Sequence, residues 1–203
     1  MCSGVKVAGF SALCVALTTN ARAAHAAESS GVYLRGYLSG GLLRTDTKPG
    51  HSSGPGVATQ FDLGGRLSTP LRLHASLILD HSPAQTVTTT SAFGGTYSTT
   101  IGGLGLGLTY NAERYTLTTV LGAQGTSFPP PGEQHEGNNA SSPGPFLSLA
   151  AGRYWGLGDA GHVGLHLLGR YAMAKDETNG GVYDPKSYFL GLGVFIGFDD
   201  SDS

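Results

Sequence analysis

Charged residues and cysteines are scarce in this sequence. Only 13% of the 203 residues are Asp, Glu, Lys or Arg, against roughly 25% in an average soluble protein. The formal net charge is −2, so we expect no nucleic-acid partner. Both cysteines, Cys2 and Cys14, lie near the N-terminus. The rest of the chain therefore has no disulfide, cysteine nucleophile or thiolate metal site.

Long apolar runs are also missing. No stretch reaches the 18 or more apolar residues that a transmembrane helix needs. Lys6, the apolar residues 7–17 and the small residues around His25 are typical of a secretory signal peptide. We therefore expect a signal peptide over residues 1–27, one domain over 28–198 and a short acidic tail over 199–203.

Glycine is the residue in excess, with 33 copies. That density disfavours helix in almost every window, and the apolar residues recur with a period of two, as in strands. Eight such segments follow one another, the first beginning at Gly31 and the others covering residues 57–67, 71–81, 97–110, 115–128, 146–155, 162–175 and 186–198. In the fourth segment the apolar parity shifts after Ile101, so we expect a β-bulge at Gly102 and Gly103.

The connections between these segments alternate in length. Residues 44–56, 82–96, 129–145 and 176–185 form long polar connections, whereas 68–70, 111–114 and 156–161 are short. Consecutive antiparallel strands place all long connections at one end and all short ones at the other, which is typical of outer-membrane barrels. The predicted fold is therefore an all-β, eight-stranded, antiparallel up-and-down transmembrane β-barrel. A soluble exported barrel, similar to a lipocalin, is the alternative.

Charged residues fall on the less apolar face of these segments. A charge facing lipid at mid-membrane costs roughly 2–4 kcal/mol, so this face is predicted to point into the barrel. An eight-stranded barrel is just wide enough to be filled by side chains. We expect an interior polar network that seals the lumen, made of Arg35, Asp62, Arg66, Arg72, Asp80, His166 and Arg170.

The last segment carries the most specific pattern. In residues 187–198, Val194, Ile196 and Phe198 alternate with other residues and end on an aromatic side chain. This segment resembles the C-terminal strand of the small eight-stranded outer-membrane barrels of the OmpX, OmpW and OmpA-barrel type, and the resemblance covers about residues 31–198. It implies a location in the outer membrane and an insertion signal at those three positions. Outer-membrane lipids, lipopolysaccharide and the insertion machinery are the implied partners.

His74 and Ser76 form the only catalytic motif worth testing. They share one face of a strand, and Asp80 could orient the imidazole, as in a nucleophilic triad. A His-x-Ser pair on one strand resembles that of outer-membrane lipid A deacylases. An interior hydrogen-bond network explains the same residues without catalysis, and we predict no enzyme activity. His162 and His166 would lie about 13 Å apart on a strand, so we expect no metal site. The glycine-rich residues 102–108 alternate as a strand with no helix after them, so we expect no phosphate-binding loop and no cofactor.

The sequence thus favours a structural or surface-interaction role through long external loops, whose ligand it does not identify. The second hypothesis is a narrow channel for small or apolar solutes, similar to that suggested for OmpW-like barrels. A lipid A-modifying enzyme is the third.

Overall fold

The computed structural model describes residues 31–47, 50–89, 96–127, 143–158, 161–174 and 185–199. The expected signal peptide and residues 200–203 of the expected tail lie outside these ranges. The described chain forms eight strands, namely β1 (Val32–Thr47), β2 (Gly50–Ser68), β3 (Leu71–Thr89), β4 (Thr96–Ala112), β5 (Tyr115–Ser127), β6 (Gly144–Leu157), β7 (Gly161–Met173) and β8 (Lys186–Asp199).

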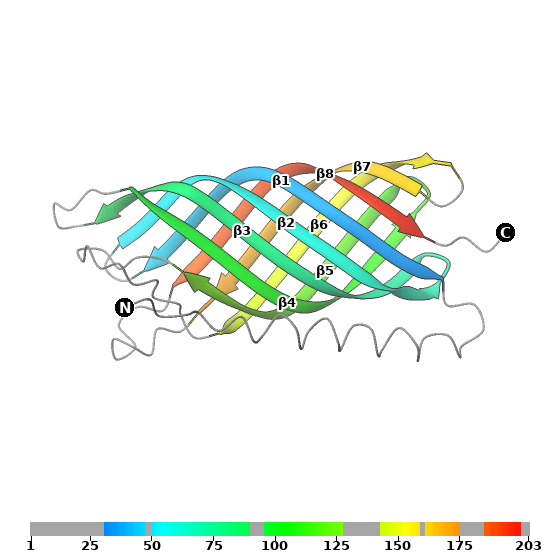
Figure 1. The fold of residues 1–203 in the computed structure, drawn as a ribbon, viewed down its shortest axis with the longest axis horizontal. Coiled ribbons are helices and arrows are strands. Elements are labelled where there is room, and N and C mark those ends of the chain that lie inside the picture. The colour runs from blue at the N-terminus through cyan, green and yellow to red at the C-terminus, as the bar shows by residue number, and fades with distance from the viewer. Residues whose placement is uncertain are drawn as a thin grey trace, which may run out of the picture.

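The strands close into a barrel in simple chain order. Each strand pairs antiparallel with the next, and β1 pairs with β8 to complete the wall. Figure 1 shows the tilted strands side by side, with the end of β8 near the start of β1 at one end of the barrel. The predicted eight-stranded antiparallel barrel is confirmed. Within the described ranges there is no helix long and apolar enough to cross a membrane.

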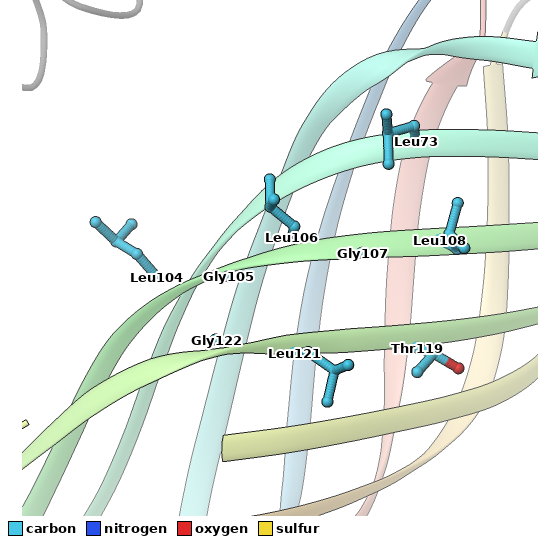
Figure 2. A pocket seen from close by; sticks show the side chains of 9 residues that line it. All are labelled: Leu73, Leu104, Gly105, Leu106, Gly107, Leu108, Thr119, Leu121 and Gly122. Carbon is cyan, nitrogen blue, oxygen red and sulfur yellow. The ribbon is translucent and has the colours of Figure 1, made fainter. Parts of the chain in front are cut away.

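Alternation of side chains divides the wall into two faces. Along β8, for example, Leu190, Leu192 and Val194 are exposed on the outside, while Phe189 and Phe195 are buried inside. Figure 2 shows a hollow in the outer wall that leucines of β3, β4 and β5 border. A soluble barrel exposes mainly polar residues, whereas the outer face of this barrel is apolar and its interior holds both polar and apolar side chains.

Two of the predicted long loops are largely strand. Arg44–Thr47 continues β1, Gly50–Gly56 belongs to β2, and residues 82–89 belong to β3. Their many Gly, Pro, Ser and Thr residues made these segments resemble loops, and Pro55 and Pro83 cannot donate a ladder hydrogen bond. The register between β2 and β3 shifts between Ser53 and Val57, and that between β3 and β4 shifts between Ser82 and Gln85. These irregularities accommodate both prolines within the wall.

The bulge predicted at Gly102 and Gly103 is wrong. The pairing of β4 with both neighbours runs through these residues without a shift. Ile101 is buried on the inner face instead. The parity seemed to change because an apolar residue occupies an inward position, not because the backbone is irregular.

Candidate functional site in the barrel interior

The polar residues expected in the interior point into the barrel. Six of them are buried, and Arg66 is partly exposed at the end with the short turns. The six buried side chains are those of Arg35, Asp62, Arg72, Asp80, His166 and Arg170. Their contacts fall at several levels along the barrel, which we describe from the long-connection end to the short-turn end.

The first level is an ion pair across the lumen. Arg170 on β7 binds the carboxylate of Asp80 on β3 through Nη1. Its Nη2 also donates to Oε1 of Gln60 at 3.1 Å. Because β3 and β7 are four strands apart in an eight-stranded barrel, this pair spans the full width of the interior.

Asp62 forms the centre of the second level. Its carboxylate accepts hydrogen bonds from Ser76 Oγ at 2.7 Å and from Gln60 Nε2 at 3.0 Å. His74 Nδ1 lies 3.0 Å from Ser76 Oγ, and its Nε2 lies 3.1 Å from Thr109 Oγ1. All the polar atoms of this group therefore have partners within the barrel wall, as a buried network requires.

This geometry does not match a catalytic triad. In the triad hypothesis Asp80 would orient His74, but Asp80 binds Arg170 and the carboxylate near His74 is Asp62. The hydroxyl of Ser76 donates its hydrogen bond to Asp62, so Ser76 Oγ can only accept a hydrogen bond from His74. A nucleophilic serine needs the histidine as its proton acceptor. His74 and Ser76 are both only 2% exposed, and the arrangement is typical of a structural network.

Arg35 makes a second connection across the lumen, at the third level. Its Nη1 donates to Thr116 Oγ1 on β5 at 2.8 Å, and Nη2 lies 3.1 Å from His162 Nε2. The guanidinium also stacks over Phe195, 4.7 Å from the ring centroid. No carboxylate of the described residues forms an ion pair with Arg35. Neutral groups and aromatic faces hold this buried cation, consistent with cation–π stabilisation.

Aromatic rings surround Arg35. Tyr37 OH lies 3.0 Å from Thr118 Oγ1 on β5, so Tyr37 also reaches the opposite wall. His166 meets Tyr37 edge to face, with centroids 5.1 Å apart, and its Nε2 lies 2.7 Å from Ser39 Oγ. Rings and guanidinium together fill the barrel between β1, β5 and β7.

The end with the short turns has a contact that the sequence analysis missed. Arg72 Nε donates to Asp199 Oδ2 at 2.8 Å, and Nη2 binds the same carboxylate. We expected Asp199 to begin the tail, but it is the last residue of β8 and pairs with Tyr33 of β1. The alternation of side chains along a strand could have predicted the inward position of Asp199, because it directly follows the outward Phe198.

An apolar layer near the other end was also missed. Leu43, Ala58, Ile101, Leu168 and Phe189 are buried and pack together on the inner face. A second cluster contains Ile78, Val120, Phe146 and Ala172. The interior therefore combines polar connections with an apolar filling, and both occupy the lumen.

The three residues of the expected insertion signal face outward. Val194, Ile196 and Phe198 are about half exposed, and their backbone pairs with β1 in the closed barrel. Among the described residues no group of three His, Cys, Asp or Glu side chains is close enough to hold a metal ion.

This chain is similar to known proteins in structure but not in sequence. No model of a known protein family matches the chain, and no curated protein is similar to it in sequence. Neisserial surface protein A has a similar structure, with 15% identity, a TM-score of 0.54, and coverage of 83% of this chain and 99% of that one. Ail of Yersinia pestis is 11% identical, with a TM-score of 0.46 and coverage of 84% and 99%. OprG of Pseudomonas aeruginosa is 12% identical, with a TM-score of 0.44 and coverage of 83% and 96%. The chain has the fold of the small eight-stranded outer-membrane barrels.

Proposed function

We propose that this protein is an integral outer-membrane barrel that acts as a closed scaffold and interacts through its long hairpins. The observation that carries the proposal is the distribution of side chains between the two faces of the wall. Large apolar residues cover the outside, whereas the inside holds ion pairs and hydrogen bonds together with an apolar filling. Exposed apolar surface of this extent is unfavourable in water and favourable in a lipid bilayer.

The dimensions of the apolar band suit a bilayer. On β1 the outward apolar residues begin at Val32 and end at Leu42, and the next outward residue is Arg44. At about 3.3 Å per residue and a tilt of about 45°, this stretch spans roughly 23 Å along the barrel axis. Outer-membrane barrels carry an apolar band of about 25 Å. We therefore propose outer-membrane lipids, with lipopolysaccharide in the outer leaflet, as the partners of this band.

Aromatic residues mark both edges of the band. Tyr110, Tyr115 and Trp155 lie on the outer face near the short turns, and Tyr171 and Tyr188 lie near the long connections with ring centroids 5.1 Å apart. Aromatic side chains concentrate at membrane–water interfaces because one end is apolar and the other is polar.

The hairpins extend beyond the membrane. β2 and β3 each have 19 residues, which corresponds to about 44 Å along the axis at a tilt of about 45°. The hydrocarbon core of a bilayer is only about 30 Å thick. The β1–β2 and β3–β4 hairpins would therefore project into the external medium, where polar loops on a rigid scaffold commonly bind ligands.

Subcellular fractionation tests the location. The full chain is expressed in a Gram-negative host, and the outer-membrane fraction is analysed by gel electrophoresis with and without boiling. We expect the protein in that fraction, with faster migration before boiling because the closed barrel resists detergent. Recovery in the soluble periplasmic fraction would contradict the proposal and favour a soluble exported barrel.

Planar-bilayer recording of the purified protein distinguishes the closed-scaffold hypothesis from the channel hypothesis. The connections of Arg170 to Asp80 and of Arg35 to Thr116 both cross the lumen between opposite strands. We therefore expect no stepwise current above that of the empty bilayer. Reproducible single-channel steps would favour the narrow-channel hypothesis.

A further inference from the structure

The contact between Asp199 and Arg72, which we call the Asp199 clamp, joins parts of the chain that become neighbours only in the closed barrel. Asp199 lies at the end of β8, and Arg72 lies near the start of β3. In the barrel wall, β1 and β2 stand between these strands. The carboxylate therefore reaches Arg72 only when β8 has paired with β1.

Arg72 is held firmly at its own end of the clamp. Its Nη1 donates to the backbone carbonyls of Ser68 and Thr69, both at 2.8 Å. Ser68 is the last residue of β2, and Thr69 begins the turn between β2 and β3. The guanidinium thus uses one nitrogen to fix the turn and the other two to bind Asp199, a fork-like geometry that is specific to arginine.

A second arginine, Arg66, also lies near the carboxylate of Asp199. Arg66 and Arg72 are opposite one another in the β2–β3 ladder, and like charges in such positions repel. Arg66 Nη2 lies 3.9 Å from Asp199 Oδ1. The carboxylate therefore offsets two neighbouring cations at the end of the barrel with the short turns.

We propose that Asp199 locks the β1–β8 seam after the barrel has closed. Phe198 and Asp199, the last two residues of β8, then make contacts on opposite faces of the wall. Phe198 faces the apolar exterior, whereas Asp199 ties the finished strand to the β2–β3 turn across the interior. The inference rests on the proposed function only in that closure would accompany insertion into the membrane.

Kinetics of unfolding and refolding test the clamp. The full-length protein is purified from membranes in detergent, and the folded fraction in urea is followed by gel migration without boiling. Because the clamp forms after closure, Asp199→Asn should speed unfolding by about tenfold or more and change the refolding rate less than twofold. The matched control is Glu113→Gln, which removes the same charge from an exposed turn residue at the same end of the barrel and should leave both rates within twofold.

Coupling to Arg72 makes the test specific. Arg72→Gln alone should also speed unfolding, and the double variant Asp199→Asn/Arg72→Gln should unfold no faster than Arg72→Gln. Any of three results would overturn the proposal. Asp199→Asn could unfold at the wild-type rate, the double variant could unfold at the rate expected if the two single effects multiply, or Glu113→Gln could speed unfolding as much as Asp199→Asn.

Two further outcomes are distinguishable. If Asp199→Asn yields no folded protein, Asp199→Glu should restore the folded band because it keeps the carboxylate, and failure to restore it would contradict the clamp. If the wild-type protein is found in the soluble fraction and does not shift on boiling, the proposed function fails whatever the variants do.

Discussion

Glycines on the inner face leave space for the largest interior side chains. A Cβ atom on Gly107 would collide with the imidazole of His74, one on Gly164 would collide with the ring of Phe195, and one on Gly197 would collide with His162. In each case the glycine is the ladder partner of the ring-bearing residue on the neighbouring strand, so the ring lies beside a position that has no side chain. The excess of glycine in this sequence is therefore explained in part by packing in the interior.

Gly107→Ala should destabilise the barrel by about 1–3 kcal/mol, the usual cost of overpacking a filled core. The matched control is Gly40→Ala, because a Cβ there meets nothing within 4 Å. We expect a lower urea midpoint for Gly107→Ala in detergent micelles and little change for Gly40→Ala. Equal midpoints for the two variants would contradict the packing explanation.

The Arg170–Asp80 pair should be strongly coupled, since removing one partner leaves a buried charge unpaired. Arg170→Ala or Asp80→Ala alone should cost about 3–5 kcal/mol. The double variant should cost clearly less than the sum of the two, as a double-mutant cycle of unfolding free energies would measure. Additive losses would show that the two side chains do not depend on one another.

At the scale of the strand, alternation decides where each side chain points, and bulges decide how far a strand continues. The period of two in the sequence correctly predicted the outward leucines and the inward charges. It underestimated β2 and β3, since Pro55 and Pro83 resembled strand ends although register shifts keep them in the wall. A single sequence does not specify whether a proline meets a regular ladder or a bulge.

Leu106→Arg on β4 tests the assignment of the outer face to lipid. An arginine at mid-membrane should cost about 2–4 kcal/mol and near the interface only about 0–1 kcal/mol. Ser98→Arg is the matched control, because Ser98 is exposed on the same strand and eight residues nearer its outer end. We expect only Leu106→Arg to lower the folded fraction in phospholipid vesicles. Similar losses for both variants would argue against a lipid-facing position.

For the whole molecule, closure brings together residues that the sequence leaves unrelated. The eight strands, their order and the inward face could be predicted from the sequence. The partners across the lumen could not, because they depend on barrel diameter and on the register between strands. The triad hypothesis paired Asp80 with His74, six positions away, whereas Asp80 binds Arg170, which is 90 positions away. Contacts across the interior of a barrel are therefore set by the closed wall as a whole and not by the sequence of any one strand.

Spin labelling on β4 tests the central claim, a closed barrel with its apolar face in lipid, most directly. Single cysteines replace Leu104, Leu106 and Leu108, with Ser98 as the aqueous reference. The two native cysteines, Cys2 and Cys14, are changed to serine so that only the chosen site is labelled. In vesicles, collisions of the three label sites with dissolved oxygen should be frequent and those with a water-soluble nickel complex rare, while Ser98 should show the reverse. Free access of the nickel complex to positions 104, 106 and 108 would contradict the membrane-spanning barrel.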